Sequence, residues 1–239
     1  MKELLKIAGA ALGILVPFLF ILTLNKGIQA SEADEEQKRK YRRRLATIVL
    51  FCTVLVWILS LNRVLDYHPG DMIPRFTVPL VAFVFMGLYL VSNSGFLRIL
   101  SYTPIQALVG VQAFRFAGVA FFFIAYLGIL PGSFMIAGAG DLLTGILAIT
   151  AAKAIRNKAP NAKMYFKLFN IVGLLDLLNV AFLLLSFYPY WHTALPSSEN
   201  ATRFSLVLIP ALVAPIAMLL HIYSIMVEVT YSRIESEPE

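Results

Sequence analysis

The sequence predicts an all-α membrane protein, a polytopic bundle of seven transmembrane helices with its N-terminus outside and its C-terminus in the cytoplasm. Three observations support this fold class. Hydrophobic residues make up 59% of the 239-residue chain and charged residues only 14%, whereas soluble proteins average roughly 45–50% and about 25%. The apolar residues form long uninterrupted runs, and the charged residues gather between those runs. Such a chain buries its apolar surface in a bilayer.

Seven apolar stretches approach the ~20 residues that a helix needs to cross a bilayer. They cover residues 4–24, 45–61, 76–91, 105–130, 134–151, 164–187 and 204–227. The first stretch is longer than the ~7–15-residue apolar region of a secretory signal, so we expect a true span there. The whole chain, residues 1–239, is then one membrane domain.

The distribution of lysine and arginine predicts the orientation of these helices. With seven spans, fourteen of these residues fall on one side of the membrane and five on the other, and Arg115 lies within a span. Loops rich in Lys and Arg stay in the cytoplasm. This rule places the N-terminus of this multi-pass protein outside and its C-terminus inside.

The most basic segment, residues 31–44, predicts a charged cytoplasmic helical extension of the second span, with Ser31 as its cap. The net charge of +6 does not indicate a nucleic-acid partner, because the basic residues flank membrane spans. A solvated loop that sets the topology is one interpretation of the segment. The other is a binding surface for anionic lipid, formed by Lys38, Arg39, Lys40, Arg42, Arg43 and Arg44.

Polar residues within the predicted spans form the candidate site. Three pairs have i,i+3 spacing, which places both members on one helix face. These candidates for ligand binding or proton coupling are Gln112 with Arg115, Asp141 with Thr144, Asp176 with Asn179, and a lone intramembrane histidine, His221. Charges at such depth cost several kcal/mol unless they are paired or face water. We therefore expect Arg115 and the two acids to converge inside the bundle.

Counting ~1.5 Å of rise per residue from the outer helix ends places Arg115 nearer to Asp176 than to Asp141. The sequence therefore predicts a direct Arg115–Asp176 contact, with Asp141 reached only through Gln112, water or helix tilt. Two acids and one arginine leave one carboxyl without compensation. Asp141 is then the candidate for an acid that is protonated, or exchanges protons, near neutral pH.

Two composition features bear on helix shape. Gly138, Gly140 and Gly145 make the start of the fifth span narrow, which predicts close contact with neighbouring helices. Pro210 and Pro215 fall within the last apolar run and predict that this helix is the most bent.

Metal binding and catalysis are not indicated. His68 and His192 lie in predicted outer loops, but neither has a second His or Cys at ligand spacing. His221 on an apolar helix is more typical of a hydrogen-bonded structural residue. No nucleophile–base arrangement follows from the spacing, so the sequence predicts no metal, no cofactor and no catalytic residues, and it does not favour an enzyme.

A pattern in the middle of the chain resembles one found in uncharacterised bacterial multi-span membrane proteins. It consists of Gln112-Ala113-Phe114-Arg115, then Leu130-Pro131, then Gly140-Asp141-Leu142-Leu143-Thr144-Gly145 and Ala148. In that family a Q-x-F-R element precedes a Leu/Val-Pro turn and a D-x-L-x-G element. Its members often carry Asn or another polar residue where this chain has Gly140. The resemblance implies a bacterial inner-membrane setting and implies no biochemical function.

Two functional hypotheses follow. In the first, a small-molecule or ion binding or transport protein has a pocket between its fourth to seventh helices, lined by Gln112, Arg115, Asp141, Asp176 and Asn179. Arg115 would hold a small anionic ligand and Asp141 would couple protons. In the second, the protein is a non-catalytic scaffold or accessory subunit in which the same residues fix helix packing.

Overall fold

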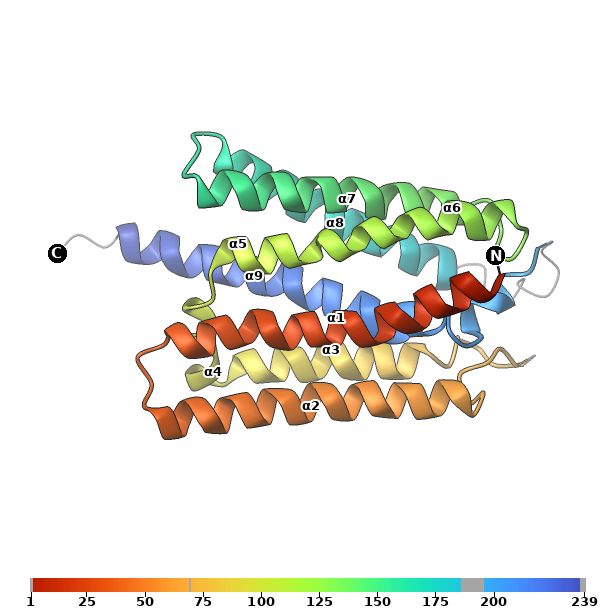
Figure 1. Ribbon diagram of the computed structural model, residues 1–239, viewed down its shortest axis with the longest axis horizontal. Helices are drawn as coiled ribbons and strands as arrows, with labels where there is room; N and C mark the ends of the chain where they lie inside the picture. The colour runs from red at the N-terminus through yellow and green to blue at the C-terminus, as the bar shows by residue number, and fades with distance from the viewer. Residues whose placement is uncertain (1, 69, 186–195, 237–239) are drawn as a thin grey trace.

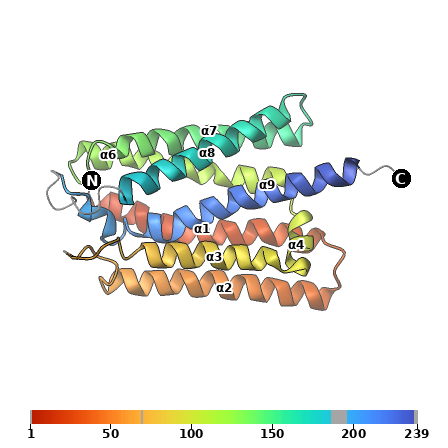
Figure 2. The same cartoon turned by 180° about the vertical axis from the view of Figure 1, so that it is seen from behind.

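The protein is a bundle of long helices in the computed structural model, which describes residues 2–68, 70–185 and 196–236. Six of these helices are long and apolar enough to cross a membrane, and a bent pair of helices makes a seventh candidate. The first residues of the chain and the end of the last helix lie at opposite ends of the bundle (Figures 1 and 2).

The first layer of the bundle contains four helices. They are α1 (Lys2–Ala30), α2 (Glu35–Leu61), α3 (Thr77–Ser92) and α4 (Ser94–Ser101). The first three run along the bundle and α4 lies at one end of it (Figure 1). Large apolar side chains such as Phe18, Phe51 and Phe85 are exposed on this layer, as expected of helix faces that meet lipid.

The bent pair is α3 with α4. The two helices meet at 92°, and the side chain of Asn93 caps α4 by accepting a hydrogen bond from the Phe96 N–H at 3.2 Å. With 16 residues, α3 is about 24 Å long at 1.5 Å per residue. That length is short of the ~30 Å hydrocarbon core.

The helix formed by the charged segment, residues 31–44, does not begin at Ser31. Asp34 is the N-cap of α2, and its side chain accepts a hydrogen bond from the Gln37 N–H at 2.7 Å. Ser31 instead follows α1, where its hydroxyl donates to the carbonyl oxygen of Ile28 at 2.8 Å. The expected Ser31 cap is therefore wrong, because a second cap-forming residue lies closer to the helix. From Glu35 onward the charged and apolar parts form one continuous helix.

The second layer holds the buried charged residues of the chain. One broken helix consists of α5 (Ile105–Gly110), the 3-10 segment η1 (Val111–Gly118) and α6 (Val119–Tyr126). It packs mainly against α7 (Phe134–Arg156), which packs in turn against α8 (Ala162–Leu185). This layer lies opposite α1–α3 in both views (Figures 1 and 2).

The broken helix ends at Tyr126 although the apolar run continues to Leu130. Gly128 adopts a left-handed conformation with φ 65°, and the Ile129 N–H bonds back to the carbonyl oxygen of Ile124 at 3.0 Å. This arrangement is a glycine-terminated helix end. The run of apolar residues continues past Tyr126, but the backbone turns there, so the helix is shorter than the apolar run.

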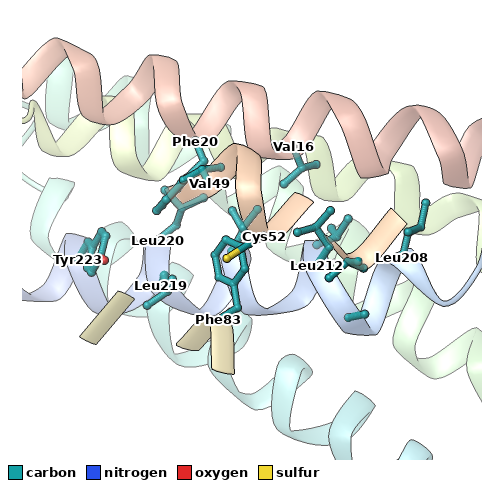
Figure 3. Close-up of a cluster of buried hydrophobic side chains, with 14 of the residues drawn as sticks. Val16, Phe20, Val49, Cys52, Phe83, Leu208, Leu212, Leu219, Leu220 and Tyr223 are labelled. Atoms are coloured by element: carbon teal, nitrogen blue, oxygen red, sulfur yellow. The ribbon is translucent and has the colours of Figure 1, made fainter. Parts of the chain in front are cut away.

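Helix α9 (Ala214–Ser236) lies between the two layers and carries much of the core. Its buried side chains meet those of α1, α2 and α3 in the cluster of Figure 3. The cluster includes Val16, Phe20, Val49, Cys52, Phe83, Leu212, Leu219, Leu220 and Tyr223. This contact joins the first layer to the helix that also faces the polar site.

The start of the last helix is irregular, as its two prolines suggest. A π-helical segment, η4 (Ile209–Val213), contains Pro210 and leads directly into α9, whose second residue is Pro215. Pro210 cannot donate a backbone hydrogen bond, and π-helical turns are a common adjustment in such places. A short 3-10 segment, η3 (Ser198–Thr202), precedes this region.

The narrow face of α7 is confirmed. Gly138 and Gly145 lie against the backbone of η1, with Gly118 and Phe116 as their neighbours, and Gly140 lies against α8. A side chain at any of these three positions would meet an atom of the neighbouring helix. Close packing of α7 brings the acids of α7 and α8 within reach of η1.

Candidate functional site

Arg115 is the centre of the site. It lies on η1, the eight-residue 3-10 segment in the middle of the broken helix, and is only 2% exposed. A 3-10 stretch within a longer helix often marks a functional or strained position. Its tighter winding changes which side chains face the interior, a change that the apolar pattern of the sequence does not reveal.

Two carboxylates bind the guanidinium of Arg115 directly. Its Nε donates to Asp141 Oδ1 at 2.7 Å, and its Nη2 donates to Asp176 Oδ2. The expected Arg115–Asp176 contact is present. The expectation that Asp141 would be reached only through Gln112, water or tilt is wrong.

The reason for this error lies in the helix end at Tyr126. Measured from there, Arg115 is about 16 Å deep at ~1.5 Å per residue, because residues 127–133 turn instead of adding helical rise. Asp141 on α7 and Asp176 on α8 lie at similar depths below the corresponding ends of their helices. The length of the arginine side chain covers the remaining gap.

The opposite side of the guanidinium meets α8 and α9. Nη1 donates to the carbonyl oxygen of Gly173 at 3.4 Å and lies 3.3 Å from His221 Nε2. Since guanidinium can only donate, Nε2 accepts, and the ring proton sits on Nδ1. From there it is donated to Asn170 Oδ1 at 2.9 Å.

A closed set of hydrogen bonds surrounds this histidine. Asn170 donates its amide to the Phe166 carbonyl oxygen at 3.0 Å, and its Oδ1 also lies 3.2 Å from the Ser224 hydroxyl. The imidazole of His221 stacks on Phe169 at a centroid distance of 4.6 Å. His221 is thus fully buried and hydrogen-bonded through both ring nitrogens.

Asn170 and Ser224 were not among the sequence candidates. Ser224 lies three residues after His221, and Asn170 lies six before Asp176. Ser224 therefore shares a helix face with His221, and extending the i,i+3 pattern along α9 would have found it. Asn170 is six residues from Asp176 and lies on a different side of α8, so the i,i+3 spacing gives no signal for it.

The two carboxylates open onto a cavity of about 400 Å³. Its walls come from α1, the η1–α6 segment, α8, η4 and the start of α9, and they are almost wholly apolar. Representative wall residues are Ala8, Leu12, Phe121, Val180 and Ala217. Arg115, Asp141 and Asp176 are the charged residues of the lining, so the cavity is an apolar chamber with one charged end.

Hydrogen-bond capacity is distributed unevenly at that charged end. Four of the five N–H groups of Arg115 are directed at Asp141, Asp176, Gly173 and His221. The second carboxylate oxygens, Asp141 Oδ2 and Asp176 Oδ1, receive no hydrogen bond from the described residues. One guanidinium and two carboxylates carry a formal charge of −1 when both acids are ionised.

Close backbone approach makes this arrangement possible. A methyl group at Gly140 would overlap the carboxylate of Asp176, and one at Gly118 would overlap the Asp141 side chain. Each carboxylate therefore lies directly over a glycine of the neighbouring helix. Small residues allow helices to approach in this way in lipid.

Three sequence candidates are not joined to the charged cluster. Thr144 is buried, and its hydroxyl donates to the Gly140 carbonyl oxygen of its own helix at 2.8 Å. Gln112 is fully buried, and neither Nε2 nor Oε1 has a hydrogen-bond partner in the described part of the chain. Asn179 is half-buried and makes no hydrogen bond to the cluster within the described ranges.

Outside the bundle interior, His68 is exposed on the loop after α2, and His192 lies outside the described residues. Among the residues that the structure describes, no three His, Cys, Asp or Glu side chains gather as a metal site would require.

Comparison with known proteins gives one family match. The model described as "Domain of unknown function (DUF8737)" matches residues 73–227, a span that holds the whole charged cluster and the pattern from Gln112 to Ala148. The wall that α1 contributes to the cavity lies before that span. No curated protein and no solved structure matches the chain.

Proposed function

The chain belongs to this family, whose domain has no assigned function (DUF8737), and we propose that it is a multi-pass membrane protein that binds a small molecule within the bundle. The binding site is the cavity that ends on Arg115, Asp141 and Asp176. One observation carries the proposal: two buried carboxylates and one guanidinium face an apolar chamber large enough for a ligand. Ligand pockets are typically apolar chambers with a few convergent polar groups.

Transport is the extended form of this proposal. Charged residues at such depth in a membrane mark substrate and proton pathways more often than packing sites. The ligand would enter the cavity from one side and leave from the other, with Asp141 exchanging a proton. Asp141 suits this role because its side chain is 20% exposed, whereas that of Asp176 is 4% exposed.

The orientation within the membrane follows from charge. The α1–α2 connection, α4 and the α7–α8 connection lie at one end of the bundle (Figure 1). Together with the adjoining ends of α1, α2, α7 and α8, these segments carry most of the Lys and Arg residues. We place this end in the cytoplasm. Seven spans, with α3 and α4 as one of them, then put the N-terminus outside and the C-terminus inside, in a bacterial inner (plasma) membrane.

The basic part of α2 is proposed to bind anionic lipid. Arg39, Lys40, Arg43 and Arg44 line an open hollow on its surface, where phosphate groups of the cytoplasmic leaflet would lie. Two further basic side chains of this segment have protein partners: Lys38 pairs with Glu35 at 3.3 Å, and Arg42 donates to Asn25 at 3.1 Å.

A non-catalytic scaffold or accessory subunit is the second candidate. It is favoured by the hydrogen bonds that join Arg115, His221, Asn170 and Ser224, because such a closed set fixes helix packing without a ligand. The scaffold requires no ligand in the cavity, and this difference separates the two candidates.

A thermal-shift screen of small amphiphiles on the purified protein in lipid nanodiscs tests cavity binding. Ala8 lines the cavity on α1, so Ala8→Phe fills part of the chamber. We expect compounds that stabilise the wild type to lose their effect in this variant. The matched control is Ala139→Phe on the exposed face of α7, which should preserve it.

Two outcomes would refute the binding proposal and leave the scaffold. One is a screen in which amphiphiles of every charge fail to stabilise the wild type. The other is stabilisation that persists unchanged in Ala8→Phe, because the compounds would then bind elsewhere.

A further inference from the structure

We infer that the ligand of the cavity is a lipophilic cation, such as a primary amine attached to an apolar body. The inference rests on the proposed function and names its substrate class. It replaces the small anionic ligand that Arg115 suggests when the sequence is considered alone. Three features of the charged end lead to it.

The first feature is the hydrogen-bonding state of Arg115. An anion needs free N–H groups, but four of the five guanidinium N–H groups are already directed at protein acceptors. To bind there, an anion would have to displace Asp141 or Asp176, leaving a buried carboxylate without its counter-charge. That exchange is costly in a low-dielectric interior.

The second feature is the state of the carboxylates. Asp141 Oδ2 and Asp176 Oδ1 accept no hydrogen bond from the described residues, and both acids line the cavity. Asp176 is only 6% exposed and its Oδ1 lies against Gly140, whereas the side chain of Asp141 is 20% exposed. Asp141 is therefore the carboxylate that a donor in the chamber reaches more easily. An ammonium group offers three N–H donors and one positive charge.

The third feature is the charge balance within the cavity. Among the described residues, the other lining residues, on α1, α6, η4 and the start of α9, are all uncharged. His221 accepts from Arg115 through Nε2 and so contributes no compensating charge. When both acids are ionised, the Arg115, Asp141 and Asp176 group carries a charge of −1 that a bound cation neutralises, and the apolar walls take up the rest of the molecule.

A matched series of probes tests the sign of the charge: octylamine, octan-1-ol and octanoate. At neutral pH these eight-carbon chains carry one positive charge, no charge and one negative charge. Affinities would be measured by calorimetry in nanodiscs of neutral phosphatidylcholine, with empty nanodiscs subtracted. We expect octylamine to bind at least tenfold more tightly than octan-1-ol, which corresponds to about 1.4 kcal/mol of binding free energy. Octanoate should bind more weakly than both.

Asp141→Asn provides the second arm. This near-isosteric change removes the net negative charge but keeps an oxygen that can accept from Arg115 Nε. We expect the affinity for octylamine to fall at least tenfold, whereas the affinity for octan-1-ol stays within twofold. Circular dichroism and gel filtration of the variant confirm that it is folded.

The outcomes separate this inference from the proposed function. If octanoate binds as tightly as octylamine and Ala8→Phe abolishes both, the cavity binds ligands but the cation assignment is wrong. Octylamine binding that Asp141→Asn leaves unchanged also overturns the assignment. If none of the three probes binds, or Ala8→Phe changes nothing, the proposed function itself fails.

Discussion

The two sides of the Arg115 guanidinium differ in how completely the protein satisfies them. On the packed side, formed by Gly173, His221, Asn170 and Ser224, each donor meets an acceptor and the groups are buried. On the cavity side, formed by Asp141 and Asp176, each carboxylate keeps one oxygen directed at no described donor. The packed side holds helices together, and the cavity side retains unused binding capacity.

This difference shows how one buried arginine can serve both structure and binding. An isolated Arg in a helix bundle would be costly, but the packed side and the two acids together hold it in place without a ligand. The second acid is more than Arg115 needs for charge neutrality. In the proposed function, the ligand interacts with that second acid, whereas a structural ion pair would not need it.

The largest effect is expected from removing the guanidinium charge. Arg115→Gln leaves Asp141 and Asp176 close together without their partner, and breaking a buried ion pair typically costs about 3–5 kcal/mol. Unfolding in detergent micelles, followed by circular dichroism, measures the free-energy change. Arg203→Gln, at an exposed arginine, is the control and should change stability by less than ~0.5 kcal/mol. A loss below ~1 kcal/mol for Arg115→Gln would mean that the cluster does not stabilise the bundle.

A moderate effect is expected on the packed side. His221→Leu leaves one Arg115 N–H without its acceptor and leaves Asn170 Oδ1 with the Ser224 hydroxyl as its one remaining donor among the described residues, and a buried donor without a partner costs about 1–3 kcal/mol. The same unfolding measurement applies. If His221→Leu is neutral, the hydrogen bonds of the packed side contribute nothing net, and the contrast between the two sides disappears.

The smallest effect, of opposite sign, is expected at Gln112. Its buried amide has no partner among the described residues, so burial of the amide costs free energy without a compensating hydrogen bond. Gln112→Leu keeps a similar volume and should be neutral or stabilising by up to ~1 kcal/mol. The exposed Gln37→Leu serves as the reference for a surface change. A loss above ~1 kcal/mol at Gln112 would instead show that an ordered water or ligand satisfies the amide.

The sequence predicted the parts of the site that depend on a charged residue within an apolar run or on a small residue at a helix contact. Arg115, Asp141 and Asp176 stand out within apolar runs, and their convergence follows from the cost of leaving any of them in lipid. The glycines of α7 likewise predicted its close contacts. These features need only residue type and spacing.

Other parts of the site depend on backbone geometry that residue type does not determine. Gly128 ended the broken helix at Tyr126, which shifted the depth of Arg115 and gave it a second direct partner, Asp141. The 3-10 winding of η1 has no signature in the apolar pattern. The cavity is formed by small, branched and aromatic apolar side chains, and residue type alone does not tell whether such a side chain fills the core or lines a cavity.

The central claim is that the cavity side binds a ligand and the packed side does not. The most direct test is the affinity for octylamine of Asp176→Asn and His221→Leu, measured side by side in the same nanodiscs. We predict at least a tenfold loss in Asp176→Asn and a change below twofold in His221→Leu. Equal losses in both variants, or a loss in His221→Leu alone, would contradict this division of roles around Arg115.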